Sequence, residues 1–165
     1  MNYLRLIVSL VLPLAAGIVG SVFTVSSADS WYALLIKPAF TPPDSLFGPV
    51  WTILYLMMGV SVYLIWSAYA NASADKQKIG KNKEAKEAFW LFWIHLLFNA
   101  SWSVIFFGLQ NIGLALINIM LLWIFILALI IKYWKIERQA AWLLLPYIIW
   151  VTFATALNYS LLVLN

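Results

Sequence analysis

The chain has 165 residues, of which 65% are hydrophobic and only 10% are charged, whereas an average soluble domain is ~45–50% apolar and ~25% charged. Together with a mean hydropathy of +0.93, this composition excludes a water-soluble globular domain and indicates that the protein lies in lipid. The net charge is +4, and what it indicates depends on where along the chain the charged residues lie. The absence of cysteine excludes disulfide bonds, thiolate metal sites and a cysteine nucleophile.

Long uncharged segments alternate with short charged ones along the chain. A helix needs ~20 apolar residues to cross a bilayer, and the uncharged runs 6–28, 45–74 and 139–165 each supply one crossing. The run 88–131 is about twice the length of one crossing, and it is interrupted at 108–113, where glycine and asparagine tolerate positive φ. The runs lack the alternation typical of barrel strands. We therefore predict an all-α integral membrane bundle, a single domain over 1–165, with five transmembrane helices at about 4–26, 47–70, 88–108, 112–133 and 139–163.

Nine of the ten lysines and arginines fall on one side of this topology, and only Lys37 falls on the other. Positive charge is enriched on the cytoplasmic side of membrane proteins, so we expect a cytoplasmic amino terminus and an outer carboxyl terminus, in a bacterial cell membrane. The basic loop from Asn71 to Lys86 is short, has no interleaved aromatic residues and contains acidic residues. We therefore expect no nucleic-acid binding.

The first segment has some features of a signal peptide, with Arg5 before an apolar core and small residues at its end. Its apolar run exceeds the ~7–15 residues of a signal-peptide core, so we favour a retained helix. Gly17 and Gly20 belong to overlapping pairs of small residues spaced by four, which suit close packing of helices, and Pro13 lies inside the segment.

The outer loop, 27–46, is the longest connection on the side opposite the lysines. It contains four prolines within or directly after it, together with Trp31, Tyr32 and Phe40. Proline restricts the backbone, so we expect an ordered lid. Such a lid could close a ligand cavity or could merely seal the end of the bundle.

Polar residues inside the membrane fall on helix faces. On the third helix one face carries His95, Asn99, Trp102, Ser103 and Phe106, and this face is expected to look into the bundle. The fifth helix carries a similar stripe at four-residue spacing, formed by Pro146, Trp150, Ala154 and Asn158. The second helix pairs Trp51 with Tyr55, and the fourth helix has a lone polar residue, Asn118.

The ten tryptophans divide by depth. Five fall near the cytoplasmic helix ends and are expected to form an interfacial aromatic belt. Trp123 has no aligned polar partner and is expected to contact other side chains or lipid. The belt residues are Trp66, Trp90, Trp93, Trp134 and Trp142. The inward residues are Trp51 and Trp102 in the outer half and Trp150 near the middle of the membrane.

Several kinds of chemistry have no candidates in the sequence. No carboxylate falls inside a predicted crossing, so a conventional acid–base catalytic site is not expected. His95 is the single histidine, which leaves at most one axial ligand to a haem iron and favours an interhelical hydrogen bond. We expect neither a metal site nor a required cofactor.

Short motifs in order along nearly the whole chain resemble one known family, the tryptophan-rich sensory protein and translocator protein (TspO/MBR) family, which includes the peripheral benzodiazepine receptors. The motifs are Trp31-Tyr32, Lys37-Pro38, Thr41-Pro42-Pro43, Gly48-Pro49-Val50-Trp51, Tyr55, Met58-Gly59, Leu96-Leu97-Phe98-Asn99, Trp102-Ser103, Phe106-Phe107-Gly108, Gln110, Gly113, Leu144-Leu145-Pro146-Tyr147, Trp150, Ala154 and Leu157-Asn158-Tyr159.

The resemblance implies a five-helix bundle, often a homodimer, whose pocket is closed by the first loop and binds porphyrins such as protoporphyrin IX, and also benzodiazepine-type ligands. The expected partners are thus a porphyrin or another flat hydrophobic molecule and membrane lipid. The family's pocket maps onto Tyr32, Pro42, Trp51, Asn99, Trp150 and Ala154, and neighbouring candidates are Phe47, Tyr55, His95, Trp102 and Asn158.

The resemblance leaves three functions open. We expect a membrane tetrapyrrole-binding sensor or regulator. The alternatives are a light-dependent porphyrin-degrading enzyme, with Trp51 and Trp150 as catalytic residues, and a transporter of porphyrins or lipids. Lys37 is a candidate partner for a porphyrin propionate.

The sequence departs from the family's pattern at three places. His95 stands where the family often has glutamine, and Asn118 stands where an acidic residue is common. The carboxyl-terminal cholesterol motif of animal members is incomplete because no basic residue follows Tyr159, so sterol transport is not expected.

Overall fold

The computed structural model describes residues 2–28, 30–74 and 79–165. These residues form helices and connecting turns, without strands, and five helices are long and apolar enough to span a membrane. The predicted all-α fold with five membrane helices is therefore confirmed. The elements are α1 (Tyr3–Ala28), α2 (Trp31–Leu34), α3 (Asp44–Ala74), α4 (Ile79–Ser103), the π-helical turn η2 (Val104–Gly108), α5 (Ile112–Ile136) and α6 (Arg138–Leu164).

The helices extend past the predicted crossings, most of all at the end of the bundle that carries the amino terminus. There α3 continues to Ala74 and α4 begins at Ile79, nine residues before the predicted start at 88. The charged first turns of α4 extend the helix without needing the hydrocarbon core, so the charge gap underestimates its length. Asp75, Lys76 and Lys78 of the predicted basic loop lie outside the described residues.

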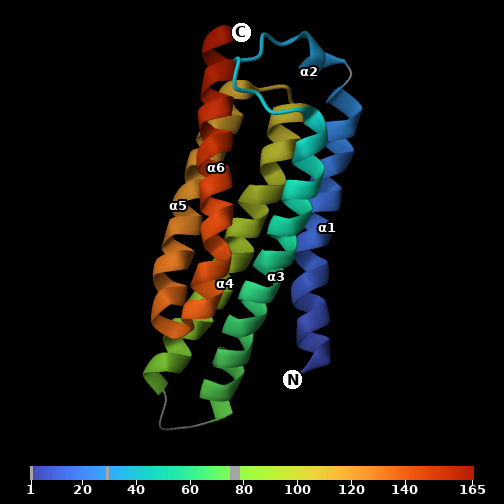
Figure 1. The fold of residues 1–165 in the computed structure, drawn as a ribbon. Coiled ribbons are helices and arrows are strands. Elements are labelled where there is room, and N and C mark those ends of the chain that lie inside the picture. The colour runs from blue at the N-terminus through green and yellow to red at the C-terminus, as the bar shows by residue number, and fades with distance from the viewer. Residues whose placement is uncertain (1, 29, 75–78) are drawn as a thin grey trace.

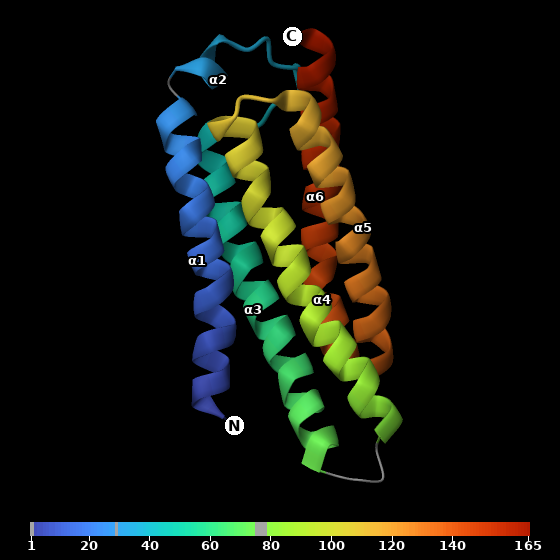
Figure 2. The same ribbon diagram turned by 180° about the vertical axis from the view of Figure 1, so that it is seen from behind.

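Consecutive long helices run in opposite directions through the bundle (Figures 1 and 2). The amino terminus lies at the same end as the α5–α6 junction, and α2 and the carboxyl terminus lie at the opposite end. Helix α3 packs against α1, α4 and α6, and α5 packs against α4 and α6. In the most apolar stretch of α1, 17% of the residues are buried, whereas 33% are buried in the corresponding stretch of each of the other four long helices. Helix α1 is therefore the most peripheral of the five.

Small residues let α1 approach its neighbours closely. A Cβ atom on Gly59 of α3 would lie 2.8 Å from the Ser9 carbonyl oxygen of α1, and one on Gly20 would lie 3.0 Å from the Ser103 hydroxyl oxygen. A Cβ atom on Gly17 would overlap the Tyr55 ring. The packing role that the sequence predicts for Gly17 and Gly20 is therefore confirmed.

The break between the third and fourth crossings begins with η2. Its wide turn is closed by the hydrogen bond from Leu109 N–H to the Val104 carbonyl (2.9 Å). The predicted interruption at 108–113 is present, since η2 ends at Gly108 and α5 begins at Ile112, but its residue with positive φ is Gln110, at 53°, and no described glycine has positive φ. Asn111 has extended backbone because it caps α5, where its side chain accepts a hydrogen bond from Leu114 N–H (2.8 Å).

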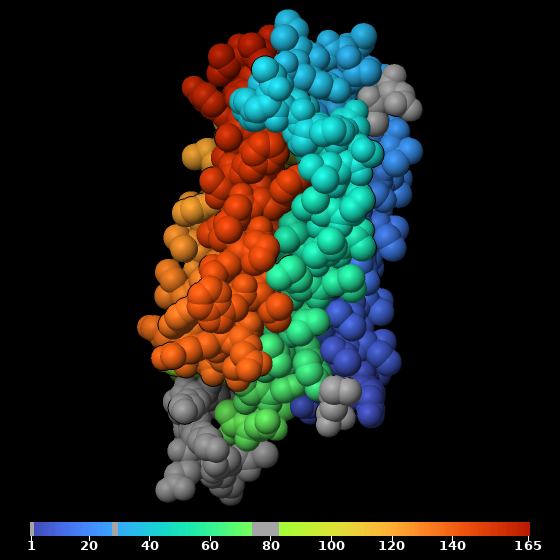
Figure 3. Space-filling view, in the orientation of Figure 1, coloured from blue at the N-terminus to red at the C-terminus, as the bar shows by residue number. Residues whose placement is uncertain are grey.

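The loop between α1 and α3, which we call the lid, covers the end of the bundle beside α3 and α6 (Figure 3). The rings of Trp31 and Tyr32 make edge contacts with Phe106 of η2, at centroid distances of 5.5 and 6.1 Å, and Phe40 contacts Phe153 of α6 at 6.1 Å. These contacts fix both halves of the lid on the bundle, as expected for an ordered cap.

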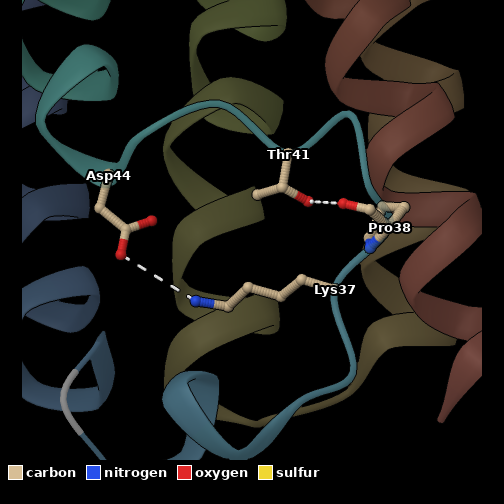
Figure 4. Close-up of polar contacts among 4 residues, drawn as sticks. All are labelled: Lys37, Pro38, Thr41 and Asp44. Atoms are coloured by element: carbon tan, nitrogen blue, oxygen red, sulfur yellow. Dashed lines mark hydrogen bonds and ion pairs between the residues drawn. The ribbon is translucent and has the colours of Figure 1, made fainter.

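Two sets of hydrogen bonds also stabilise the lid. Thr41 closes a tight turn by donating backbone and side-chain hydrogen bonds to the Pro38 carbonyl, at 3.0 and 2.7 Å (Figure 4). At the end of α6 the Asn165 side chain accepts a hydrogen bond from Ile36 N–H (2.9 Å) and donates one to the Ile36 carbonyl (3.1 Å). This two-point pairing joins the middle of the lid to the last helix.

Candidate ligand-binding site

A cavity of about 470 Å³ lies beneath the lid, and side chains from all five long helices line it. Its volume is within the ~300–1,000 Å³ typical of small-molecule sites. Nine of the eleven predicted ligand-binding residues contribute to its wall. They are Tyr32 of the lid, Phe47, Trp51 and Tyr55 of α3, Asn99 and Trp102 of α4, and Trp150, Ala154 and Asn158 of α6.

The other two predicted residues do not line the cavity. Pro42 lies in the lid, close to the start of α3, and His95 is fully buried within the bundle, one helical turn from Asn99. The four-residue spacing placed His95 on the correct face of α4. It could not show that His95 contacts the Tyr147 hydroxyl of α6 and lies outside the cavity wall.

The largest unpredicted part of the wall comes from α1. Beyond its first turn, the sequence of α1 is apolar except for serine and threonine, and two of these residues, Ser21 and Thr24, line the cavity. The small residues of this helix also follow helical spacing, but the sequence analysis interpreted them as packing positions alone. The α1 residues of the wall are Leu14, Gly17, Ile18, Ser21, Thr24 and Val25.

Aromatic rings form opposite parts of the wall. On α3, Trp51 lies 5.6 Å from Tyr55 and 6.2 Å from Tyr147, measured between ring centroids. On α6, Trp150 lies 5.8 Å from Phe47, with the rings 70° apart. Ala154 follows Trp150 by one turn and leaves the face of α6 open beside the indole, as the sequence suggested.

The tryptophans of the wall differ in their hydrogen bonding. The Trp102 indole N–H donates to Asn158 Oδ1 (3.1 Å), and Asn158 Nδ2 donates to the Ile112 carbonyl (3.0 Å). These bonds join α4, α6 and the start of α5, so the polar groups of Trp102 and Asn158 serve the fold. The Trp150 indole nitrogen is buried and has no hydrogen-bond partner. A buried donor without an acceptor is unfavourable, so the position of this ring is set by its packing and not by a hydrogen bond.

A chain of hydrogen bonds leads from the cavity into the bundle. The Tyr55 hydroxyl donates to Asn99 Oδ1 (2.7 Å), and Asn99 Nδ2 donates to the Tyr147 hydroxyl (2.8 Å). That hydroxyl lies 3.2 Å from His95 Nε2, and His95 Nδ1 lies 2.7 Å from the Phe92 carbonyl oxygen. The interhelical hydrogen bond expected of His95 is therefore present, and Tyr147 is a site-supporting residue that the sequence analysis missed.

One expectation about another position is wrong. Pro146 is exposed, because residues spaced by four turn about 40° further round a helix at each step, so the stripe on α6 faces the cavity only from Trp150 onward. Trp123 packs against the core as expected, and its indole N–H also donates to Thr152 Oγ1 of α6 (2.8 Å). Asn118 finds its partner on another helix, since its Nδ2 donates to Ser101 Oγ of α4 (2.9 Å).

The predicted aromatic belt divides into two groups. Trp90, Trp134 and Trp142 are exposed at the end of the bundle that carries the amino terminus. Trp66 and Trp93 pack instead on the ring of Phe89, at 5.4 and 5.7 Å. All five lie away from the cavity wall.

The charges near the cavity belong to the lid and to the start of α3. Asp44 lies on the cavity rim, and its Oδ2 lies 4.0 Å from Lys37 Nζ (Figure 4). Lys37 Nζ also lies 4.0 Å from the centroid of the Tyr32 ring, a cation–π contact. Burial raises the pKa of the Tyr32 hydroxyl above its usual value, and the Asp44 charge adds to the rise, so this hydroxyl stays neutral. Lys37 does not itself line the cavity.

Comparison with known proteins identifies the family. The sequence model of the TspO/MBR family matches residues 9–164. The chain is 40% identical to the "Tryptophan-rich protein TspO" of Archaeoglobus fulgidus, over 100% of this chain and 99% of that protein. It is 36% identical to the human "Translocator protein", over 86% of this chain and 78% of that protein, and 33% identical to "Protein CrtK" of Rhodobacter capsulatus, over 91% and 86%. These relatives support a role as a membrane sensor or regulator. The chain is an integral membrane protein and belongs to the TspO/MBR family.

Proposed function

We propose that the cavity binds a tetrapyrrole of the protoporphyrin IX type and that the chain is a membrane sensor or regulator of this ligand. The observation that carries the proposal is the cavity beneath the lid, whose wall contains the aromatic rings of Phe47, Trp51 and Trp150. Aromatic faces in an enclosed apolar site suit a flat molecule with a large apolar face.

The aromatic walls support a flat ligand. Stacking on Trp51 and Trp150 would contribute ~0.5–1.5 kcal/mol per ring pair beyond the burial of apolar area. The small side chain of Ala154 leaves room beside Trp150 for the edge of a macrocycle. The same features suit flat benzodiazepine-type ligands, which we include in the proposal.

The charges on the lid bear on the orientation of the ligand. The pair between Lys37 and Asp44 spans 4.0 Å and is partly exposed, and such pairs contribute only ~0–1 kcal/mol. A propionate that approached the rim could therefore replace Asp44 as the partner of Lys37. We propose Lys37 as this partner through exchange of its ion pair.

The proposal includes the setting of the site. The concentration of lysine and arginine at one end supports a cytoplasmic amino terminus and an outer lid, in a bacterial cell membrane. We also propose that the protein is a homodimer and that it needs no resident cofactor, the porphyrin being a ligand.

A fluorescence titration tests the proposal. Protoporphyrin IX is added in the dark to the detergent-solubilised protein, and quenching of tryptophan emission is followed for the wild type and for Trp51→Phe/Trp150→Phe. We expect saturable quenching and a loss of about tenfold or more in affinity in the double variant, since two large ring contacts are reduced. Equal affinity in both proteins would refute the assignment of the cavity.

A second candidate function is light-driven oxidation of the bound porphyrin by dioxygen. The observation that favours it is that two readily oxidised indoles, those of Trp51 and Trp150, line the same cavity. Illumination of the complex in air should then give one defined product, and the double variant should not form it. Bleaching at the rate of free porphyrin would leave binding alone as the function.

A further inference from the structure

A second concave surface lies on the outside of the bundle and is lined by residues of α4 and α5, toward the end that carries the amino terminus. Figure 2 shows these two helices side by side. This groove has a volume of about 570 Å³. Lysines surround the part nearest that end of the bundle, and apolar side chains of α4 form the rest of its floor. It is separate from the cavity under the lid, because the two share no residue. The residues of the groove are Lys83, Lys86, Glu87, Trp90, Leu91, Ile94 and Lys132.

The groove has an excess of positive charge. Lys132 Nζ of α5 lies 3.0 Å from Glu87 Oε2 of α4, and this ion pair joins the two walls. With that pair neutral, Lys83 and Lys86 remain, so three positive charges and one negative charge leave +2. Both remaining lysines are exposed. An anionic group would therefore meet two available ammonium groups beside a partly exposed third.

The apolar part of the groove continues from the lysines along the same face of α4. Trp90 is 58% exposed and Ile94 is 46% exposed, although both are large apolar side chains. Lys83, Lys86, Trp90 and Ile94 follow helical spacing, and the rise from the first to the last is about 16 Å at 1.5 Å per residue. The charged residues lie near the start of α4 and the apolar residues lie further along the same helix. This order matches that of a phospholipid, from head group to acyl chain.

We propose that this groove is a specific site for one anionic phospholipid. The head-group phosphate contacts Lys83 and Lys86, and Lys132 pairs with Glu87, so that the repulsion between this carboxylate and the phosphate is reduced. One acyl chain lies along Trp90 and Ile94. Basic pockets between transmembrane helices are suited to anionic head groups, and the end with most of the lysines and arginines is where such a pocket is found here. The site does not depend on the ligand proposed for the cavity.

Native mass spectrometry of the full-length protein tests the site. The protein, released from detergent micelles, is titrated with phosphatidylglycerol and with phosphatidylcholine of the same acyl chains. We expect one phosphatidylglycerol to be retained more tightly than phosphatidylcholine. The variant Lys83→Gln/Lys86→Gln should lower this retention by about thirtyfold, given the usual contribution of a lysine to the binding of anionic lipid. Trp90→Ala should lower it as well, because the acyl contact is lost.

The matched control is Lys135→Gln/Arg138→Gln. It also removes two exposed positive charges from the same end of the bundle, but from outside the groove. We expect this control to retain phosphatidylglycerol within about threefold of the wild type, since only long-range attraction is lost. An equal loss in both double variants, or equal retention of the two lipids, would show that attraction is general and would overturn the site. Displacement of the lipid by an equal concentration of glycerol phosphate would also overturn it, because a free phosphate would then suffice.

Discussion

The hydroxyl of Tyr147 on α6 lies 3.2 Å from His95 Nε2 on α4, and this contact sets the direction of the hydrogen bonds behind the cavity. His95 Nδ1 faces the Phe92 carbonyl oxygen at 2.7 Å, so Nδ1 carries the hydrogen and Nε2 of the neutral ring accepts one. Tyr147 must then donate to His95 and accept from Asn99 Nδ2. This leaves Asn99 Oδ1 to face Tyr55. His95 therefore fixes the orientation of a cavity amide that it does not touch.

Replacement of His95 tests this relationship. His95→Leu removes the acceptor of the buried Tyr147 hydroxyl, and we expect the free energy of unfolding to fall by about 1–3 kcal/mol. His95→Gln offers an amide oxygen in the same region and should retain most of the stability and porphyrin affinity. Thermal unfolding in detergent and the quenching titration measure the two effects. A leucine variant as stable as the wild type would show that the contact contributes nothing.

Two tryptophan variants separate ligand binding from folding. Trp102→Phe leaves Asn158 Oδ1 without its donor, so we expect it to lose about 1–3 kcal/mol more stability than Trp150→Phe, whose indole N–H has no partner. Trp150→Phe should instead show the larger loss of porphyrin affinity. Chemical denaturation and quenching, performed on both variants, provide the comparison. The opposite ranking in both measurements would contradict the assigned roles.

The cavity also depends on a glycine of α1. In Gly17→Ala the added methyl group would overlap the Tyr55 ring, so the ring must shift away from Asn99. We expect a loss of stability of about 1–3 kcal/mol, typical of overpacking, together with weaker ligand binding. Gly113→Ala is the control, because its Cβ atom would lie 3.8 Å from the nearest atoms, an ordinary contact. Calorimetric melting of both variants should show a lowered midpoint for Gly17→Ala alone.

The pairing of Asn165 with Ile36 predicts the rate of lid opening. Asn165→Ala removes two hydrogen bonds that join the lid to α6, and each such bond contributes about 0.5–1.5 kcal/mol. If ligand leaves by way of the lid, its dissociation should become faster by about five- to a hundredfold. Stopped-flow exchange of bound porphyrin measures this rate. Ser160→Ala, which removes only a hydroxyl bonded within α6, should leave it unchanged.

The sequence predicts much of the fold because a bilayer imposes a fixed apolar length on each crossing. The inward faces of α3, α4 and α6 were also predictable, since polar residues inside lipid repeat at helical spacing, as Asn99 and Trp102 do. The wall from α1 was not, because its polar members, Ser21 and Thr24, carry small hydroxyls that bond to the carbonyls of their own helix and do not mark an inward face. Nor could the sequence reveal that His95 contacts the Tyr147 hydroxyl and stays outside the cavity wall. That arrangement depends on how two helices pack, and a one-dimensional pattern does not encode the distance between them.

The π-helical turn η2 gives the aromatic wall an unusual dependence on chain length. Such a turn holds one residue more than an α-helical turn, and this extra residue helps to bury the consecutive rings of Phe106 and Phe107. Deleting one residue of η2 outside the wall, such as Ile105, would let the turn return to α geometry and would change the direction in which the Phe106 and Phe107 rings leave the helix. The shape of the cavity is therefore encoded in the register of this segment as well as in its side chains, and a one-residue insertion or deletion here would remodel it without changing the identity of any wall residue.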